Sequence, residues 1–295
     1  MPRKTGENKK DRTGLLFGTV GAPLGTPKKP GGSPGAIEYI AELGLGTLEL
    51  GWVQSVRVSD ATCEIIRAAS VTYGIPLSVH APYFINLNAQ TSELLRGSRE
   101  RLVSAARAGY KAGATDIIFH PGGYMKSSPA EAYETIRLRL AEIVQQLREE
   151  HIDVTLRPET MGKSALFGTL EECVQLSVDI PGVLPCIDFA HLHARRGDGS
   201  FNSYTEFSKA LAYVKKHLGT QGIRTLHIHL SGIAYSAKGE RHHLPLEEAD
   251  LRYEELFQAL VDAGARGRVL CESPIMEHDA ARMKKSYEKS KKRED

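Results

Sequence analysis

Residues of the kinds that bind metal ions recur along the chain where short apolar runs end. Six of them end such a run or follow it closely: His80, His120, Glu159, Asp188, His229 and Glu272. Three more lie in later segments: His191, Glu240 and His242. Imidazole and carboxylate groups together suit Zn²⁺, with Mn²⁺ and Fe²⁺ as alternatives. The set is too large for one tetrahedral ion, so it predicts two or three ions that share bridging carboxylates.

A single histidine at the end of a strand is more often a hydrogen-bonded structural residue than a ligand, so one alone would indicate little. Carboxylates gathered at one place without cations would repel one another and lose their hydration, which costs free energy. A site that collects several carboxylates and several imidazoles is therefore better explained by bound cations.

The elements that must position these residues follow from hydrophobic periodicity. Short apolar and β-branched runs predict strands at 14–19, 46–50, 76–80, 115–120, 153–158, 183–188, 224–230 and 268–272. Segments of helical period lie between them, at 34–43, 58–73, 92–112, 129–149, 169–178, 203–218, 248–263 and 277–290. Ser33-Pro34 and Ser128-Pro129 each place a capping hydroxyl before a proline at the first helical position, and Glu131 completes a capping box with Ser128.

Strands that alternate with helices in this way predict an α/β fold, a single (β/α)8 TIM barrel, for which about 250 residues suffice. An open, doubly wound sheet is the alternative, and the strand count and the lack of a GxGxxG turn disfavour it. In a TIM barrel the C-terminal ends of the strands meet at one mouth, where active sites lie. This fold would therefore bring the strand-end candidates to one rim.

Length and composition agree with one soluble domain. The chain has 295 residues, of which 41% are hydrophobic. No apolar run approaches the roughly 20 residues of a membrane helix, and the polar start lacks a signal peptide, so we expect a cytoplasmic protein. The four cysteines are widely spaced, which indicates reduced thiols rather than a disulfide framework.

The net charge of +2 conceals basic ends and an acidic middle. We expect a disordered basic tail at 1–13, a barrel domain at 14–281 and a second basic tail at 282–295. An acidic body argues against a broad basic surface for nucleic acid, although bound cations would offset the carboxylates where an anionic substrate must lie.

Short motifs carry a resemblance to a known family. They are SVHAPYFINL (78–87), IIFHPG (117–122), PETMG (158–162), CIDFAH (186–191), HIHLSG (227–232), GERHHLPL (239–246) and VLCES (269–273). In order and spacing they resemble endonuclease IV, the zinc-dependent apurinic/apyrimidinic endonucleases, from about residue 14 to 275. Each motif alone is weak, whereas the whole series in the family's order is specific for the fold and the metal site.

The resemblance implies a ligand set and a reaction. The implied ligands are His80, His120 and Glu159 for one zinc ion, Glu159, Asp188, His229 and Glu272 for a second, and His191, Glu240 and His242 for a third. The implied reaction is hydrolysis of the phosphodiester 5′ to an abasic site in duplex DNA, a step of base excision repair that leaves a 3′-hydroxyl. Two neighbouring ions would stabilise the attacking and leaving oxygens. Glu159 and Glu272 would be the catalytic carboxylates, with Glu272 orienting or deprotonating the attacking water.

Four residues are candidates to contact DNA. Tyr83 and Phe84 stand where the family uses side chains that penetrate DNA at the lesion; the alternative is that they only pack their loop. Gln54 and Arg57 lie in LGWVQSVRVSD (50–60), which replaces the family's polar, arginine-bearing loop. The expected partner is DNA that contains abasic sites, with no membrane and no organic cofactor, and we expect a monomer.

The sequence departs from the family pattern at several positions. Glu240 stands where the family usually has aspartate, the histidine of the first strand is absent from FGTVGAP (17–23), and Ser231-Gly232 replaces an asparagine-aspartate pair. These changes leave the implied metal ligands nearly complete and alter the segments that would contact DNA.

Some histidine assignments stay open at this point. His243 is the alternative ligand to His242 if the register differs by one residue. His227 shares a strand face with His229, so it either supports the metal site or is a buried structural histidine.

Two other functions are also open. A sugar isomerase or epimerase of the xylose-isomerase-like type would use one or two ions and a smaller ligand set, so the trio His191, Glu240 and His242 favours the endonuclease. A non-catalytic, metal-dependent nucleic-acid-binding protein would keep the fold and lose turnover. The altered loop at 50–60 and the missing first-strand histidine are the features that support this third reading.

Overall fold

The computed structural model describes residues 14–292, and in them eight parallel strands form one sheet. These strands are β1 (Leu15–Val20), β2 (Thr47–Gly51), β3 (Leu77–His80), β4 (Ala114–Phe119), β5 (Thr155–Pro158), β6 (Cys186–Asp188), β7 (Leu226–Leu230) and β10 (Gly267–Cys271). They run in the order β5-β4-β3-β2-β1-β10-β7-β6. Bridges between Leu156 and Val183 and between Glu159 and Cys186 join β5 to β6. The sheet is therefore a nearly closed barrel, and the predicted (β/α)8 fold is confirmed.

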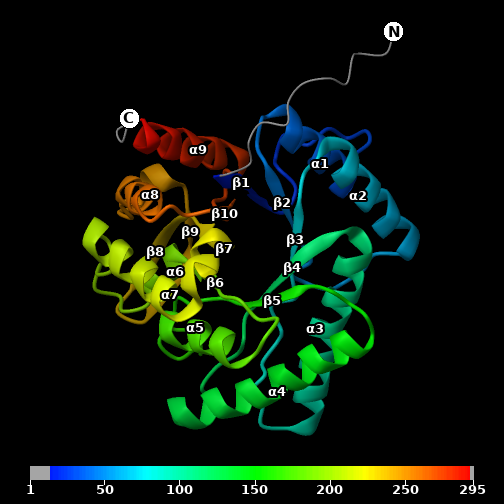
Figure 1. The fold of residues 1–295 in the computed structure, drawn as a ribbon, viewed down its shortest axis with the longest axis vertical. Coiled ribbons are helices and arrows are strands. Elements are labelled where there is room, and N and C mark those ends of the chain that lie inside the picture. The colour runs from blue at the N-terminus through cyan, green and yellow to red at the C-terminus, as the bar shows by residue number, and fades with distance from the viewer. Residues whose placement is uncertain (1–13, 293–295) are drawn as a thin grey trace.

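Helices surround the barrel and connect its strands (Figure 1). They are α1 (Gly32–Glu42), α2 (Asp60–Tyr73), α3 (Ser92–Ala112), α4 (Pro129–Glu149), α5 (Leu170–Asp179), α6 (Phe189–Ala194), α7 (Tyr204–Arg224), α8 (Tyr253–Asp262) and α9 (Glu277–Lys291). The core lies between the barrel and this layer, where Leu102 of α3, Leu140 of α4 and Phe207 of α7 are fully buried. This burial of apolar faces is the main source of stability for the fold.

Two helix starts show where the sequence prediction was right and where it was wrong. Ser128 caps α4, and Glu131 closes the predicted capping box. The predicted cap at Ser33 is wrong, because α1 already begins at Gly32, and the capping position before it is Gly31, which has no side chain to accept a hydrogen bond.

Four short elements were not predicted, and all lie in loops at the C-terminal side of the barrel. The helix α6 directly follows β6. The strands β8 (Gly232–Ser236) and β9 (Gly239–Leu244) form an antiparallel hairpin after β7. The 3-10 helix η1 (Leu246–Glu248) comes next. Because they follow β6 and β7 directly, these elements lie close to the mouth of the barrel.

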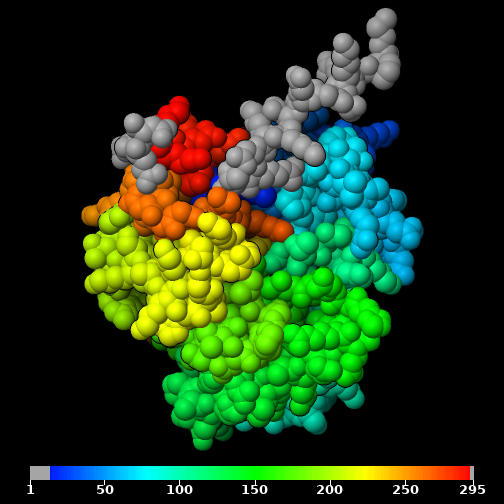
Figure 2. Space-filling view, viewed as in Figure 1, coloured from blue at the N-terminus to red at the C-terminus, as the bar shows by residue number. Residues whose placement is uncertain are grey.

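The C-terminal helix closes the ring against the first strand. Tyr287 of α9 contacts Phe17 of β1, with ring centroids 5.5 Å apart. Residues 282–291, which we predicted as part of a tail, therefore belong to the folded barrel, because Met283 and Tyr287 pack into its core. In the space-filling view, the orange and red C-terminal segments lie beside the blue and cyan N-terminal segments (Figure 2).

Three further sequence predictions concern the N-terminal tail, membrane-spanning helices and the cysteines. The predicted N-terminal tail, 1–13, lies outside the described residues. Within residues 14–292, no helix is both long and apolar enough to cross a membrane. The four cysteines are buried and form no disulfide.

Candidate metal centre

The C-terminal strand ends bring the predicted ligands to one mouth. His80 ends β3, Asp188 ends β6 and His229 lies one residue before the end of β7. His120, Glu159 and Glu272 each directly follow a strand. Glu159, Asp188 and His229 are completely buried, while about a fifth of the side chain of His120 is exposed. The site is thus embedded in the barrel and open to solvent on one side.

Glu159 lies at the centre of this group, between two pairs of histidines. Its Oε2 atom is 3.3 Å from Nε2 of His80 and 3.2 Å from Nε2 of His120. Its Oε1 atom is 3.4 Å from Nδ1 of His191 and 3.2 Å from Nδ1 of His229. A carboxylate with one oxygen beside Nε2 of His80 and His120 and the other beside Nδ1 of His229 has the arrangement of a ligand that bridges two ions.

Several buried polar atoms of the site lack hydrogen bonds. Among residues 14–292, Nε2 of His80, Oε2 of Glu159, Oδ2 of Asp188 and Nε2 of His191 have no hydrogen-bond partner. Buried polar atoms are rarely left unsatisfied, because each costs about 1–3 kcal/mol. Four such atoms in one cluster of imidazoles and carboxylates fit a site that is completed by cations.

The histidines are oriented by partners outside the cluster. Nδ1 of His80 lies 2.8 Å from the carbonyl oxygen of Ala81, and Nδ1 of His191 lies 3.0 Å from that of Thr160. A carbonyl oxygen only accepts, so each of these Nδ1 atoms carries a proton and Nε2 is free to bind a cation. Metal-binding histidines are commonly held by such outer hydrogen bonds.

Asp188 combines a structural contact with an unpartnered oxygen. Its Oδ1 accepts a hydrogen bond of 2.7 Å from the backbone N–H of His191 and so caps α6. This bond is why α6 starts at the strand end, and it places His191 beside Glu159. The other oxygen, Oδ2, is left facing the cluster.

The carboxylates of the site differ in pKa because their neighbours differ in charge. Burial alone would raise the pKa of Glu159, but the nearby histidines, His229 foremost, hold that pKa well below its usual range. Burial raises the pKa of Asp188 to about 6; the charge of His191 opposes this rise and that of Glu272 reinforces it. Without cations the cluster thus binds protons that an incoming ion must displace.

The β8–β9 hairpin supplies the outer part of the site. Oε2 of Glu240 is 3.7 Å from Nε2 of His191, and Nε2 of His243 is 3.8 Å from Oε2 of Glu272. Ala234 pairs with His242 and Tyr235 pairs with Glu240, which makes Arg241 the extra residue of a β-bulge. A bulge shifts the alternation of side chains. His243 therefore lies among the candidate ligands, whereas His242 is exposed and belongs to none of the candidate groups.

Sequence reasoning missed Glu49, a carboxylate on β2 that lies below this cluster. It is completely buried, with Oε2 2.9 Å from Nε2 of His227 and Oε1 2.9 Å from Nε2 of His229. The signal was present in the sequence, because a glutamate inside the apolar run GTLEL (46–50) needs a polar partner when the strand is buried. His227, which was left open, has Glu49 as that partner.

The DNA-contact candidates occupy two adjacent loops at the same end of the barrel. The Tyr83 ring stacks on the His120 ring, with the ring centroids 5.3 Å apart. The backbone N–H of Tyr83 donates to the carbonyl of Val53 in the preceding loop. Phe84 is 63% exposed. Gln54 lines a groove of about 240 Å³, and Arg57 is exposed on the same loop. Their role toward DNA stays a prediction.

Fold and site together define the class, a TIM barrel whose mouth gathers buried imidazoles and carboxylates around a bridging glutamate. Comparison with known proteins gives the family. A family model described as the xylose isomerase-like TIM barrel matches residues 37–293, and the chain belongs to this family.

Two individual proteins show which members of the family this chain resembles in sequence. A protein of Methanocaldococcus jannaschii that is named only as uncharacterized is 38% identical over 275 residues, which are 92% of this chain and 97% of that protein. A probable endonuclease 4 of Shouchella clausii is 30% identical over 195 residues. That match spans 63% of each of the two chains. The resemblance to endonuclease IV seen in the sequence motifs is thereby confirmed.

Solved structures show how widely the fold is shared. Endonuclease IV from Thermus thermophilus superposes with a TM-score of 0.71 at 22% identity, over 93% of this chain and 98% of that one. A D-tagatose 3-epimerase-like protein gives a TM-score of 0.69 at 18% identity, over 94% and 97%. At these identities the structural matches show the fold alone.

Proposed function

We propose that the chain is a zinc-dependent endonuclease that hydrolyses the phosphodiester 5′ to abasic sites in duplex DNA. The observation that carries the proposal is the position of Glu159, whose two oxygens face separate histidine pairs. The unpartnered buried atoms around it support a cluster of cations. The sequence relatives named as probable endonuclease 4 support the reaction class.

We assign the residues at the mouth to three ions. The proposed ligands of the first are His80, His120 and Glu159, whose ligand atoms lie within 4.8 Å of one another. Those of the second are Glu159, Asp188, His229 and Glu272, and those of the third are His191, Glu240 and His243, which pairwise contacts support. His243 replaces His242 in this assignment, because it is the hairpin histidine that lies beside Glu272 and His191. Bound ions would supply positive charge to the phosphate oxygens as negative charge develops on them.

Side chains at the mouth supply a base and two aromatic rings to the proposed reaction. Glu272 lies at the edge of the cluster with 11% of its side chain exposed, so it can reach a water on the solvent side and accept its proton. The Tyr83 ring packs against the rings of His80 and His120 at the rim of the centre. Phe84 extends farther out, where it can insert next to an unstacked nucleotide.

Cleavage of a defined duplex tests this function. The substrate is an end-labelled duplex with one abasic-site analogue, and the protein is the full chain loaded with zinc. We expect a cut directly 5′ of the lesion that leaves an extendable 3′-hydroxyl and disappears after chelator treatment. Glu272→Gln should lower the cleavage rate by about 100-fold or more. The matched control, Glu288→Gln on the exposed surface of α9, should cut at the wild-type rate.

The outcomes separate the competing functions. A zinc-loaded protein that cuts no faster than the chelator-treated protein contradicts the endonuclease. If the same preparation interconverts ketose epimers, sugar epimerisation replaces it. If it binds the abasic duplex in a metal-dependent way without cutting, a non-catalytic binding protein replaces it.

A further inference from the structure

Glu49 is a buried carboxylate beneath the metal centre that the proposed ligand groups do not use. Its side chain enters the barrel from β2 and is completely buried. Its Oε2 atom accepts a hydrogen bond of 2.7 Å from the Ser78 hydroxyl and lies 2.9 Å from Nε2 of His227. Its Oε1 atom lies 2.9 Å from Nε2 of His229. Among residues 14–292, Oε1 of Glu49 and Nε2 of His229 meet the geometry of no hydrogen bond, so this 2.9 Å ion-pair contact is the polar contact that the two atoms share.

This contact distinguishes His229 from the other histidines of the site. The outer nitrogens of His80 and His191 face backbone carbonyls. The outer nitrogen of His229 faces a carboxylate, and its other nitrogen, Nδ1, points to Glu159 and Glu272 at 3.2 and 3.5 Å. An imidazole with one nitrogen held by a carboxylate and the other directed at an ion is a recurrent way to orient a ligand and raise its basicity.

We propose that Glu49 is a positioning residue whose carboxylate holds the proton on Nε2 of His229 and so presents Nδ1 to the ion between Glu159 and Glu272. This inference deepens the proposed function and rests on it for the presence of that ion. The second oxygen of Glu49 lies beside His227 and accepts from the Ser78 hydroxyl, and the Ser78 bond keeps the carboxylate beside His229 even without the His227 contact.

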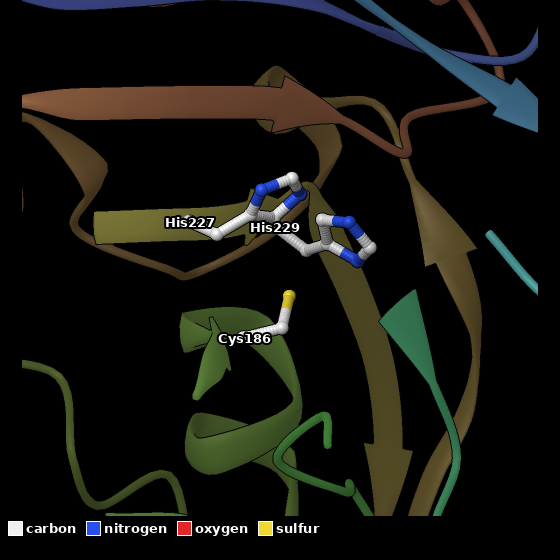
Figure 3. A group of neighbouring side chains, drawn as sticks. All are labelled: Cys186, His227 and His229. Carbon is white, nitrogen blue, oxygen red and sulfur yellow. The ribbon is translucent and has the colours of Figure 1, made fainter. Parts of the chain in front are cut away.

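A metal ion held by Cys186, His227 and His229 is the alternative to the contact between Glu49 and the two imidazoles. Cys186 of β6 directs its thiol toward the rings of His227 and His229, and potential ligand atoms of the three residues lie within 4.8 Å of one another (Figure 3). An ion among them would compete with Glu49 for the imidazoles. Ligands about 2.0 Å from one tetrahedral ion stand about 3.3 Å apart. Nε2 of each ring lies 2.9 Å from an oxygen of Glu49, which is closer than two ligands of one ion would stand.

Two variants of the same contact network test the proposal. Glu49→Gln removes the carboxylate that faces His229, whereas the matched control His227→Gln removes the imidazole at the opposite oxygen and leaves the His229 contact in place. Full-length protein is stripped with chelator and titrated with Zn²⁺ or Co²⁺ alone, against a chromophoric chelator. We expect Glu49→Gln to weaken the affinity for at least one ion by about 10- to 100-fold and to change the Co²⁺ absorption spectrum. The control should stay within about threefold of wild type.

Each result decides the question. Wild-type affinity and spectrum in Glu49→Gln, or an equal loss in both variants, would overturn the positioning role. An intense thiolate-to-cobalt absorption band in the wild type would also overturn it, because it would place an ion beside Cys186. If the wild type binds no ion, the proposed function fails as well; if it binds ions but cuts no DNA, only the proposed substrate fails.

A measurement on the unmodified protein guards against a variant that does not fold. The ¹⁵N spectrum of the histidine side chains in the zinc-loaded wild type reports which ring nitrogen carries the proton, and His229→Gln assigns the signal. We expect the proton on Nε2 of His229. A proton on Nδ1 would contradict the proposal, whatever the stability of Glu49→Gln.

Discussion

At the residue scale, the site depends on which nitrogen or oxygen atom each side chain turns toward the centre. His80 and His191 keep Nε2 for the cluster because Nδ1 is held by a backbone carbonyl. Asp188 keeps one oxygen for the cluster because the other caps α6. The protein therefore fixes the donor atoms before any ion binds, which lowers the cost of ordering them on binding.

The hairpin histidines give a test of this orientation. His243 lies among the candidate ligands with Nδ1 2.6 Å from the Ser231 hydroxyl, while its neighbour His242 points to solvent. We expect His243→Ala to lose one bound ion per chain and His242→Ala to keep the wild-type number. Elemental analysis by mass spectrometry measures both. Loss of the ion from His242→Ala alone would show that the register of the hairpin differs from the one in the structure.

Much of the site could be predicted from residue types, and the exceptions have a physical reason. The positions of His80 and Asp188 follow from apolar runs that end in a polar residue, and His229 lies one residue before the end of such a run. The choice between His242 and His243 depends on a β-bulge, which no sequence period shows. Glu49 was missed because a charged residue one position before the end of a predicted strand looks like an exposed edge residue until the strand is known to be buried.

At the scale of elements, the barrel strands and the main helices were predicted to within a few residues, apart from larger shifts at the ends of α7 and α8. Their signals are long and periodic, as in α3 and α4, whose predicted and observed bounds agree. The helix α6 and the β8–β9 hairpin were missed because both are short and are stabilised by contacts from elsewhere in the chain. The backbone N–H of Glu240, for example, donates to the carbonyl of Gly162.

Gly162 tests how the hairpin is held against the barrel. A Cβ atom at this position would lie 2.7 Å from Cβ of Glu240 and 3.1 Å from the His191 ring, so an added methyl group must push the hairpin away. We expect Gly162→Ala to displace the hairpin and to weaken binding of one ion about tenfold or more, while the remaining ions stay bound. The control is Gly35→Ala in α1, where a Cβ atom meets only ordinary contacts at 3.6 Å. Equal metal binding by the two variants would show that the hairpin does not form the third site.

At the scale of the whole molecule, the apolar core and the metal centre are separate. The core lies between barrel and helices, whereas the polar cluster fills the barrel mouth. Removal of the ions should therefore leave the fold in place and remove only the free energy of ion binding.

Thermal melting with and without chelator measures that free energy. Each ion present at about 1,000 times its dissociation constant contributes about 4 kcal/mol, so the melting temperature should fall by roughly 10 °C for each ion removed, while the helical circular dichroism at 25 °C is retained. Glu159→Gln, which loses the two ions that Glu159 bridges, should show a clearly smaller fall in melting temperature on chelator treatment than the wild type. A chelated wild type that is unfolded at 25 °C would show that the core alone does not hold the barrel.

The most direct test of the central claim is the number of metal ions per chain in the wild type and in Glu159→Gln, measured on zinc-loaded protein after removal of free metal. The two oxygens of Glu159 each face a different histidine pair, so one nearly isosteric change disturbs two ion sites together. We predict two or three zinc ions in the wild type and a loss of two in the variant. A wild type that holds no ion, or a variant that keeps every ion of the wild type, would contradict a centre bridged by Glu159.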